Sequence, residues 1–412
     1  MKRNLHIDGS RLWDSLMEMA RIGATKKGGV CRLALTDLDK QGRDLFKSWC
    51  EAAGCTVTVD PMGNMFARRS GKNNELPPVA TGSHLDSQPT GGKFDGVYGV
   101  LAGLEVLRTL NDHAIETETP VEVVVWTNEE GARFPPAMVG SGVFAGVFDL
   151  DYGWSRRDHD DNCIGDELER IGYKGDAPLG QHPFSSFFEV HIEQGPILEN
   201  EHKTIGIVTG VQGMRWYDIK LIGEEAHAGP TPMELRQDAL ACASHLLPQI
   251  YDLAISRSPH GRATIGEFRV YPGSRNTVPG TVEFTVDIRH PDADQLKSLD
   301  QGLRAVTEAT ATQRGLEYEL TAVWESRPVA FDGDCIDAVR KGAEIMEYSA
   351  KEIVSGAGHD SVYVSRVAPT GMIFIPCENG ISHNEIENAT PEDIEAGANV
   401  LLHAILERAE HS

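Results

Sequence analysis

The segment from residue 79 to residue 127 constrains the fold most, because it places a helix between two buried strands. Residues 79–84 and 121–127 are apolar runs with the length of strands. Between them, residues 97–110 carry apolar side chains at helical spacing. A strand, a helix and a strand in this order form a βαβ unit, whose two strands are parallel. We therefore predict an α/β core with a mixed, largely parallel sheet flanked by helices.

The pattern changes in the middle of the chain. A second group of elements is predicted there, with strands at 216–221, 263–270, 281–288 and 316–324 and helices at 231–253 and 293–313. Thr231, Pro232 and Glu234 have the spacing of an N-cap, a first-turn proline and a capping-box partner for the first of these helices. We predict a smaller α+β domain at 212–327, inserted into a discontinuous domain of 1–211 and 328–412.

Composition excludes several classes of function. The chain of 412 residues has 38 Lys and Arg against 62 Asp and Glu, a formal charge of −24, which opposes nucleic-acid binding. No apolar run is long enough to span a bilayer, and acidic residues interrupt the N-terminal segment where a signal peptide would need an apolar run. The 7 cysteines are scattered without a C-x-x-C pair. We expect a cytoplasmic protein with reduced cysteines and no membrane partner.

Side chains that bind metals follow the predicted strands of the large domain. Strand C-termini and helix N-termini are where open α/β sheets gather ligands. Imidazoles and carboxylates in this number suit two adjacent divalent cations, with one carboxylate to bridge them. The residues concerned are His84, Asp95, Glu129, Glu130, His191 and His383.

Glu129 and Glu130 are neighbours at the end of one strand. Two adjacent carboxylates in a cleft repel each other unless cations absorb their charge. Consecutive residues of an extended chain point in opposite directions, so one glutamate can bind a cation while the other acts as a base. The alternative interpretation of the pair is a solvated loop after a strand.

Several motifs recur in the order found in one known family. The chain resembles the metal-dependent N-carbamoyl-L-amino acid hydrolases, or hydantoinase/carbamoylase-type amidases, from about residue 10 to the C-terminus. Their superfamily also holds β-ureidopropionase, allantoate amidohydrolase, aminoacylases and metallo-exopeptidases. The motifs that carry the resemblance are GSHLDSQPTGGKFDG, WTNEEGARF, HIEQGP, EAHAGPTPM, SRNTVPG, GHDS and SHNE.

The resemblance implies a dinuclear site of zinc, manganese, nickel or cobalt. Its ligands would be His84, Asp95, Glu130, His191 and His383, with Asp95 as the bridge. Glu129 would be the general base, and the carboxylate of Asp86 would orient the His84 ring.

The resemblance also implies residues that contact the substrate. His227 would donate a hydrogen bond to the oxyanion, and Arg289 would receive the substrate carboxylate. Arg215 and Arg275 lie beside matched positions and are alternative anion contacts. The remaining matched contacts are Gln194, Asn276, Gly358 and His359.

The inserted domain would be a lid that pairs two chains. In the resembling family, lids form a two-fold dimer, and the histidine that matches His227 reaches the metals of the neighbouring chain. We therefore expect a homodimer with composite active sites.

The predicted reaction is hydrolysis of the ureido C–N bond of an N-carbamoyl-L-amino acid, which gives the L-amino acid, carbon dioxide and ammonia. Alternative substrates are allantoate, 3-ureidopropionate and N-acyl amino acids, because the motifs are common to the enzymes that act on all of them. A catalytically silent, metal-binding relative is a further alternative, although the base and all ligand positions are present.

Overall fold

A computed structural model describes residues 5–180 and 182–410 of the chain. The chain divides into two compact units, one of Met1–Thr209 with Phe331–Ser412 and one of Gly210–Ala330. The predicted domain boundaries at 211/212 and 327/328 lie within a few residues of this division. Among the described residues, no helix combines the length and apolarity that crossing a membrane requires.

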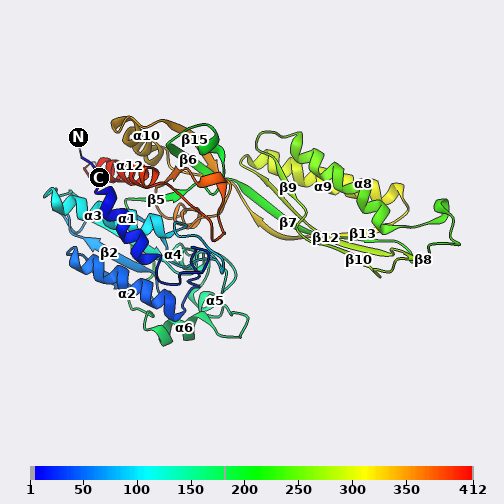
Figure 1. Ribbon diagram of the computed structural model, residues 1–412, viewed down its shortest axis with the longest axis horizontal. Coiled ribbons are helices and arrows are strands. Elements are labelled where there is room, and N and C mark those ends of the chain that lie inside the picture. The colour runs from blue at the N-terminus through cyan, green and yellow to red at the C-terminus, as the bar shows by residue number, and fades with distance from the viewer. Residues whose placement is uncertain (1–4, 181, 411–412) are drawn as a thin grey trace. The chain divides into compact units, whose positions relative to one another are not determined.

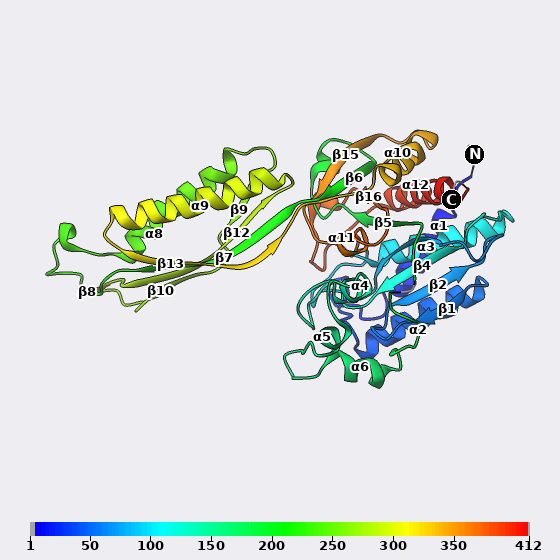
Figure 2. The ribbon, with the colours of Figure 1, turned by 180° about the vertical axis from the view of Figure 1, so that it is seen from behind.

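The larger sheet is mixed and has nine strands, in the order β1-β2-β4-β3-β5-β16-β6-β14, with β15 paired to β6 (Figures 1 and 2). All of it belongs to the first unit except β14 and the last two residues of β6. The strands are β1 (Thr56–Val59), β2 (Met65–Arg69), β3 (Val79–His84), β4 (Val121–Trp126), β5 (Ser186–Ile192), β6 (Ile205–Val211), β14 (Val329–Ala330), β15 (Ala350–Ser355) and β16 (Thr370–Ile375).

The centre of this sheet is parallel. β3 pairs in parallel with both β4 and β5, and β16 pairs in parallel with β5. The neighbouring pairs β2–β4 and β16–β6 are antiparallel. The carboxyl ends of β3, β4, β5 and β16 therefore meet at one edge of the sheet, as the βαβ pattern predicts.

Both faces of the sheet are covered, which explains why the central strands read as continuous apolar runs. Along β4, Val121, Val123 and Val125 belong to the main core, whereas Val124 and Trp126 belong to an aromatic cluster on the other face. The first face packs against α3 and α12, and α11 packs against β5 and β16. The predicted fold class is thus confirmed.

Two of the helices of this unit, α1 and α2, lie near the N-terminus. Thr36 caps the second of them by accepting a hydrogen bond from the Asp39 backbone N–H (3.3 Å). The helices are α1 (Gly9–Met19), α2 (Asp37–Ala52), α3 (Val97–Asp112), α4 (Val139–Phe144), α5 (Leu150–Trp154), α6 (Ile164–Ile171), α7 (Ile197–Asn200), α10 (Gly333–Ile345), α11 (Ser361–Val364) and α12 (Pro391–Glu410), with a 3₁₀ turn at Glu378–Gly380.

The second unit is a five-stranded antiparallel sheet with two helices on one face (Figure 1). Alternate residues of β7 and β12 face these helices and form a separate core. Its elements are β7 (Gly213–Ile222), β8 (Ala226–His227), a 3₁₀ turn (Met233–Leu235), α8 (Ala239–Ile255), β9 (Arg262–Thr264), β10 (Phe268–Tyr271), β11 (Thr277–Val278), β12 (Thr281–His290), α9 (Ala293–Gln313) and β13 (Glu317–Ser326).

The predicted start of the first helix in this unit was wrong. Thr231, Pro232 and Glu234 lie in and before the 3₁₀ turn, and α8 begins only at Ala239, where the Asp238 side chain accepts a hydrogen bond from the Ala241 N–H (2.9 Å). The Glu224 N–H donates to the Gln237 carbonyl (2.9 Å), and the chain between them forms β8, a turn and the 3₁₀ turn. The local capping pattern is thus overridden in the fold.

Candidate metal site

The parallel strands bring the predicted ligands to one edge of the first unit. His84 is the last residue of β3, and His191 is the penultimate residue of β5. Glu130 follows β4, and His383 follows β16 after a 3₁₀ turn. Asp95 lies two residues before α3, at the N-terminus of the crossover helix between β3 and β4. Four strands and one helix start therefore supply five side chains to one place.

The five side chains form two groups that share Asp95. Asp95 Oδ1 lies 3.5 Å from His84 Nε2 and 3.2 Å from His191 Nε2. Asp95 Oδ2 lies 3.4 Å from His383 Nε2, and this ring nitrogen lies 3.4 Å from Glu130 Oε2. Each group could hold one metal ion. Three protein ligands at each position, with one carboxylate common to both, are typical of a catalytic pair of cations with open coordination positions.

The histidine rings are oriented by backbone carbonyls. His84 Nδ1 lies 2.9 Å from the Asp86 carbonyl, and His191 Nδ1 lies 2.9 Å from the Ile192 carbonyl. A ring whose Nδ1 donates to a carbonyl keeps a lone pair on Nε2, which is the form that binds a metal. Both Nε2 atoms face Asp95, so the two rings fit a cation beside that carboxylate.

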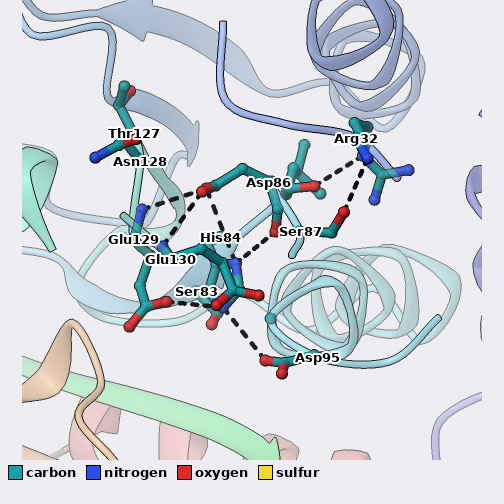
Figure 3. Close-up of polar contacts among 12 residues, drawn as sticks. Arg32, Ser83, His84, Asp86, Ser87, Asp95, Thr127, Asn128, Glu129 and Glu130 are labelled. Carbon is teal, nitrogen blue, oxygen red and sulfur yellow. Dashed lines mark hydrogen bonds and ion pairs between the residues drawn. The ribbon is translucent and has the colours of Figure 1, made fainter. Parts of the chain in front are cut away.

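The carboxylate of Asp86 faces both the glutamate pair and the His84 ring. It accepts hydrogen bonds from the backbone N–H groups of Glu129 and Glu130, both at 3.3 Å, and its Oδ1 is 3.9 Å from His84 Nδ1 (Figure 3). The Asp86 carbonyl, at 2.9 Å, is the nearer partner of this ring nitrogen. That the carboxylate orients the His84 ring stays a prediction.

The charges of the site fit the presence of cations. Burial and the neighbouring Asp95 charge raise the pKa of Glu130 to about 8. The raised pKa means that a second negative charge beside Asp95 is disfavoured, and a cation at this place would offset that cost. Burial opposes the ionisation of Asp95, but hydrogen bonds with His191 and His84 outweigh it and hold the pKa of Asp95 well below its usual range.

Glu129 borders the first group of ligands without being one of its three members. It is buried, and its Oε2 is 3.4 Å from His84 Nε2. Burial raises the pKa of Glu129 well above its usual range; His84 opposes this shift, and Asp360 adds to it. A carboxyl group with a raised pKa is suited to accept and return a proton. The two glutamates therefore face different groups, Glu129 beside His84 and Glu130 beside His383.

Backbone strain accompanies this arrangement. Asn128, Gln194 and His383 have φ angles of 57°, 57° and 53°, which residues other than glycine adopt uncommonly. Gly96 also has a positive φ of 67°, and a side chain there would collide with the His84 ring. Such conformations persist where the surrounding structure enforces them, and they cluster at functional sites.

The comparisons with known proteins agree with this geometry. Residues 80–407 match the peptidase family M20/M25/M40. The N-carbamoyl-L-amino-acid amidohydrolase of Rhizobium meliloti is 49% identical over 407 residues, which cover 99% of this chain and 98% of that protein. The chain belongs to the M20/M25/M40 family.

Further relatives of this M20/M25/M40 chain share its whole length. A hydantoinase/carbamoylase family amidase of Burkholderia multivorans, known from its crystal structure, is 62% identical with a TM-score of 0.96, over 98% of each chain. The allantoate amidohydrolase of Bacillus subtilis is 33% identical over 97% of each chain. The family is metal-dependent, and the two groups around Asp95 are residues that could hold the metal.

The remaining predicted contacts of the first unit lie close to the ligands. Gln194 donates from Nε2 to Asp95 Oδ2 (2.9 Å), so this side chain holds the shared carboxylate. His359 is buried; its ring packs 4.7 Å from that of His191, and its Nε2 pairs with Ser355 Oγ at 2.9 Å. A direct substrate contact by His359 or by the half-buried Gly358 stays a prediction.

The predicted contacts of the second unit fall into two separate places. His227 and Asn276 are exposed and adjacent, because His227 pairs with Thr277 and the Ala228 N–H donates to the Asn276 carbonyl (2.9 Å). Both lie beyond the end of the sheet where Thr281 pairs with Ile222 (Figure 1).

Arg289 lies at the opposite end of the same sheet, where it pairs with Met214. Thr281 and Arg289 are the first and ninth residues of β12, so roughly 26 Å of strand separates them at about 3.3 Å per residue. The Arg289 guanidinium is 2.7 Å from Asp287, and Arg215 is paired with Asp300 and Glu325 at 3.0 and 2.8 Å. Arg275, next to Asn276, is exposed.

Sequence reasoning missed several side chains that surround the ligands. Gln88 donates from Nε2 to Glu130 Oε2 (2.7 Å), and Ser382 donates to Asp95 Oδ2 (3.0 Å). Glu189 accepts hydrogen bonds from Ser83 (2.7 Å) and Ser361 (2.6 Å) behind His191. The alternation of β5, which puts residues 189 and 191 on one face, is a signal that could have found Glu189.

Proposed function

We propose that the protein is a metal-dependent amidohydrolase that removes the carbamoyl group from N-carbamoyl-L-amino acids. The observation that carries the proposal is the pair of ligand groups sharing Asp95, with the raised-pKa carboxyl group of Glu129 beside them. The likeness to the enzyme of Rhizobium meliloti, over nearly the whole of both chains, supports the choice of substrate.

Different residues of the first unit would bind the cations and transfer the proton. Two divalent cations, one held by His84 and His191 and one by Glu130 and His383, with Asp95 shared, would polarise the ureido carbonyl and lower the pKa of a water molecule. Glu129 accepts the proton of the attacking water and passes it to the departing amino nitrogen. The products are the L-amino acid and carbamate, which decomposes to carbon dioxide and ammonia.

His227 has the hydrogen-bond state that an oxyanion donor needs. Its Nδ1 accepts a hydrogen bond from the Gly229 N–H (3.1 Å). A neutral imidazole with this partner carries its proton on Nε2. The exposed His227 would thus present an N–H group to the developing negative charge of the substrate.

The second candidate function is the hydrolysis of allantoate, because the allantoate amidohydrolase of Bacillus subtilis is also a full-length relative. Hydrolysis of 3-ureidopropionate or of N-acyl amino acids would use the same residues. A silent relative is disfavoured, because Glu129 and all five ligand positions are present and lie together in the first unit.

A substrate panel tests the proposal. Protein loaded with Mn²⁺ or Zn²⁺ is expected to have its highest kcat/KM on N-carbamoyl-L-α-amino acids, compared with N-carbamoyl-β-alanine, allantoate and N-acetyl-L-amino acids. Chelation should abolish turnover, and added metal should restore it. A preference for another member of the panel would replace the substrate, and full activity of protein that elemental analysis shows to be metal-free would refute the mechanism.

The positions of His227 and Arg289 support a composite site. Their places at opposite ends of one sheet make it difficult for one copy of the second unit to bring both to the same cations. Two chains related by two-fold symmetry remove this difficulty, because each site can take His227 and Asn276 from one chain and Arg289 from the other. We therefore include a homodimer in the proposal, with the second unit as the lid that pairs the chains.

Subunit mixing tests the composite site. A mixture of Glu129→Gln and His227→Ala chains, each inactive alone, should regain activity after subunit exchange. In each mixed dimer, one site then has an intact Glu129 from one chain and an intact His227 from the other. Activity per mixed dimer should reach about half that of the wild type, by this count of sites.

A mixture of Glu129→Gln with Arg289→Ala is the matched control. If Arg289 serves the site of its own chain, no mixed dimer contains an intact site, and activity should stay absent. Recovery of activity in the control mixture but not in the first mixture would mean that Arg289 acts in the neighbouring chain's site and His227 in the site of its own chain. An absence of recovery in both mixtures, with exchange verified by mass spectrometry of tagged chains, would place His227 in its own chain's site.

The proposed setting is the cytoplasm. All seven cysteines are free, and five of them are buried, which suits a reducing compartment. The net charge of −24 fits a small-molecule hydrolase without a nucleic-acid partner.

A further inference from the structure

Glu387 is a buried carboxylate next to the candidate metal site to which the mechanism above gives no role. Its side chain is almost inaccessible to solvent. Oε1 accepts hydrogen bonds from the backbone N–H groups of Phe94 and Asp95, both at 3.1 Å. Oε2 is 3.0 Å from the hydroxyl of Ser382. Glu387 therefore joins the segment before α3 to the loop after β16.

These hydrogen bonds link the shared ligand to the loop of another ligand. Ser382 immediately precedes His383, and its Oγ lies 3.0 Å from Asp95 Oδ2. Gln194 Nε2 donates to the same Asp95 oxygen at 2.9 Å and lies 3.2 Å from Ser382 Oγ. The Asp95 oxygen that faces His383 is thus held by Ser382 and Gln194, while Glu387 holds the backbone of Asp95.

Gly92 reserves the space that Glu387 occupies. A Cβ at this position would collide with the carboxylate of Glu387. The φ angle of Gly92 does not lie in the left-handed region, so the close approach, not the backbone conformation, excludes a side chain here. The second glycine of the TGG segment and Glu387 therefore form one packing unit, although they lie far apart in the sequence.

The two cation positions depend on this unit to different extents. His84 and His191 are buried and belong to neighbouring strands of the sheet, so the sheet itself fixes them. The His383 side chain is 52% exposed and stands on a loop with a positive φ. Its distance from Asp95 is set by the contacts of that loop, among which Glu387 and Ser382 reach Asp95 directly.

We propose that Glu387 is a positioning residue that ties Asp95 to the loop of His383 and thereby sets the affinity of the cation position formed by Asp95, Glu130 and His383. The inference rests on the proposed function, because it assumes that cations occupy the two ligand groups. It concerns the second position above all, where both Asp95 and His383 are held through Glu387. The first position shares Asp95 but keeps His84 and His191, which the sheet fixes, so its affinity should change little.

Titration of Mn²⁺ into full-length protein freed of metal by chelation tests the inference, with binding followed by calorimetry. Wild type should bind two ions. Glu387→Ala should bind the first ion normally and the second about 10- to 100-fold more weakly, the usual effect of removing a residue that orients a ligand. Circular dichroism and the thermal midpoint of the metal-free protein report whether the fold survives.

Glu387→Gln is the conservative variant and should restore the second affinity to within a few-fold of wild type. The glutamine Oε1 can accept from Phe94 and Asp95, and its Nε2 can donate to Ser382, whose own proton then goes to Asp95. If Glu387→Gln and Glu387→Ala lowered the affinity for the second ion equally, the inference would be overturned. The hydrogen bonds that Gln can still make would then not be the cause of the affinity.

Gly92→Ala approaches the same contact from the other side and keeps the test decisive if Glu387→Ala does not fold. It should weaken the second ion to a similar extent by displacing the carboxylate. In the double variant, the new methyl group enters the space left by Glu387, so the two losses should not add. If Gly92→Ala bound the second Mn²⁺ ion with the affinity of the wild type, the proposal would be contradicted.

Glu385→Ala is the matched control on the same loop. Glu385 pairs with Lys27 (3.3 Å), and this variant should bind both ions like wild type. A wild type that binds no Mn²⁺ would refute the proposed function itself. Two ions bound with unchanged affinity in Glu387→Ala would refute only the role of Glu387.

Discussion

Replacing Glu129 with Gln should lower kcat by a factor of about 10² to 10⁴, the usual contribution of general acid–base catalysis. The amide keeps the shape of the side chain but can neither accept nor return the proton of the attacking water. Because Glu129 lies outside the two ligand groups that share Asp95, the variant should keep both metal ions. The measurement is kcat on an N-carbamoyl-L-amino acid, with metal content determined by elemental analysis on the same preparation.

Glu130→Gln is the matched control, because it changes the adjacent residue of the same loop. Glu130 lies 3.4 Å from His383 and belongs to the second ligand group, so this variant should lose one ion as well as activity. The Asp86 carboxylate accepts hydrogen bonds from the backbone N–H groups of Glu129 and Glu130, and neither substitution removes those hydrogen bonds. If Glu129→Gln lost metal and Glu130→Gln only slowed turnover, the roles of the two glutamates would be exchanged.

The parts of the site that could be predicted are those fixed by local sequence. His84 ends a strand of the βαβ unit and Asp95 precedes its helix, so this pattern places the two together, and His191 was expected at the same edge because it also ends an apolar strand. The adjacent Glu129 and Glu130 both lie at the end of β4 beside the candidate ligands, and their separate roles stay a prediction. These inferences needed only strand ends, which short-range periodicity reveals.

The parts that could not be predicted depend on long-range contacts. Glu387 reaches the backbone of Asp95 from 292 positions away, and no local pattern announces such a hydrogen bond. The start of α8 was misjudged because two capping patterns follow each other, and the helix begins after Asp238 and not after Thr231. The hydrogen bonds that the Asp86 carboxylate accepts from the loop after β4 were likewise not predicted, because they join the ends of two different strands.

The separation of His227 from Arg289 could be predicted only in part. A strand predicted at 281–288 already puts its two ends far apart, because each residue of a strand adds about 3.3 Å. What the sequence lacked was the register, which pairs Thr281 with Ile222 and so leaves His227 at one end of the sheet and Arg289 at the other. Register depends on cross-strand packing and is not a property of one segment.

Replacing Asp95 with Ala should remove both metal ions, whereas His383→Ala should remove only one. Asp95 is the residue common to the two groups, with Oδ1 facing His84 and His191 and Oδ2 facing His383. Its carboxylate is ionised, since the pKa is held well below the usual range, and it therefore supplies negative charge to both positions.

The loss of activity in Asp95→Ala should exceed the roughly 10- to 100-fold effect of residues that only orient ligands. Elemental analysis after dialysis against a fixed low concentration of Mn²⁺ measures the ion count, and circular dichroism checks the fold. Asp95→Asn is an informative companion, because its single carbonyl oxygen can serve one cation but supplies no charge. One ion retained in Asp95→Ala at wild-type affinity would show that Asp95 serves a single position. The carboxylate that Gln194 and Ser382 hold in place would then not be the bridge.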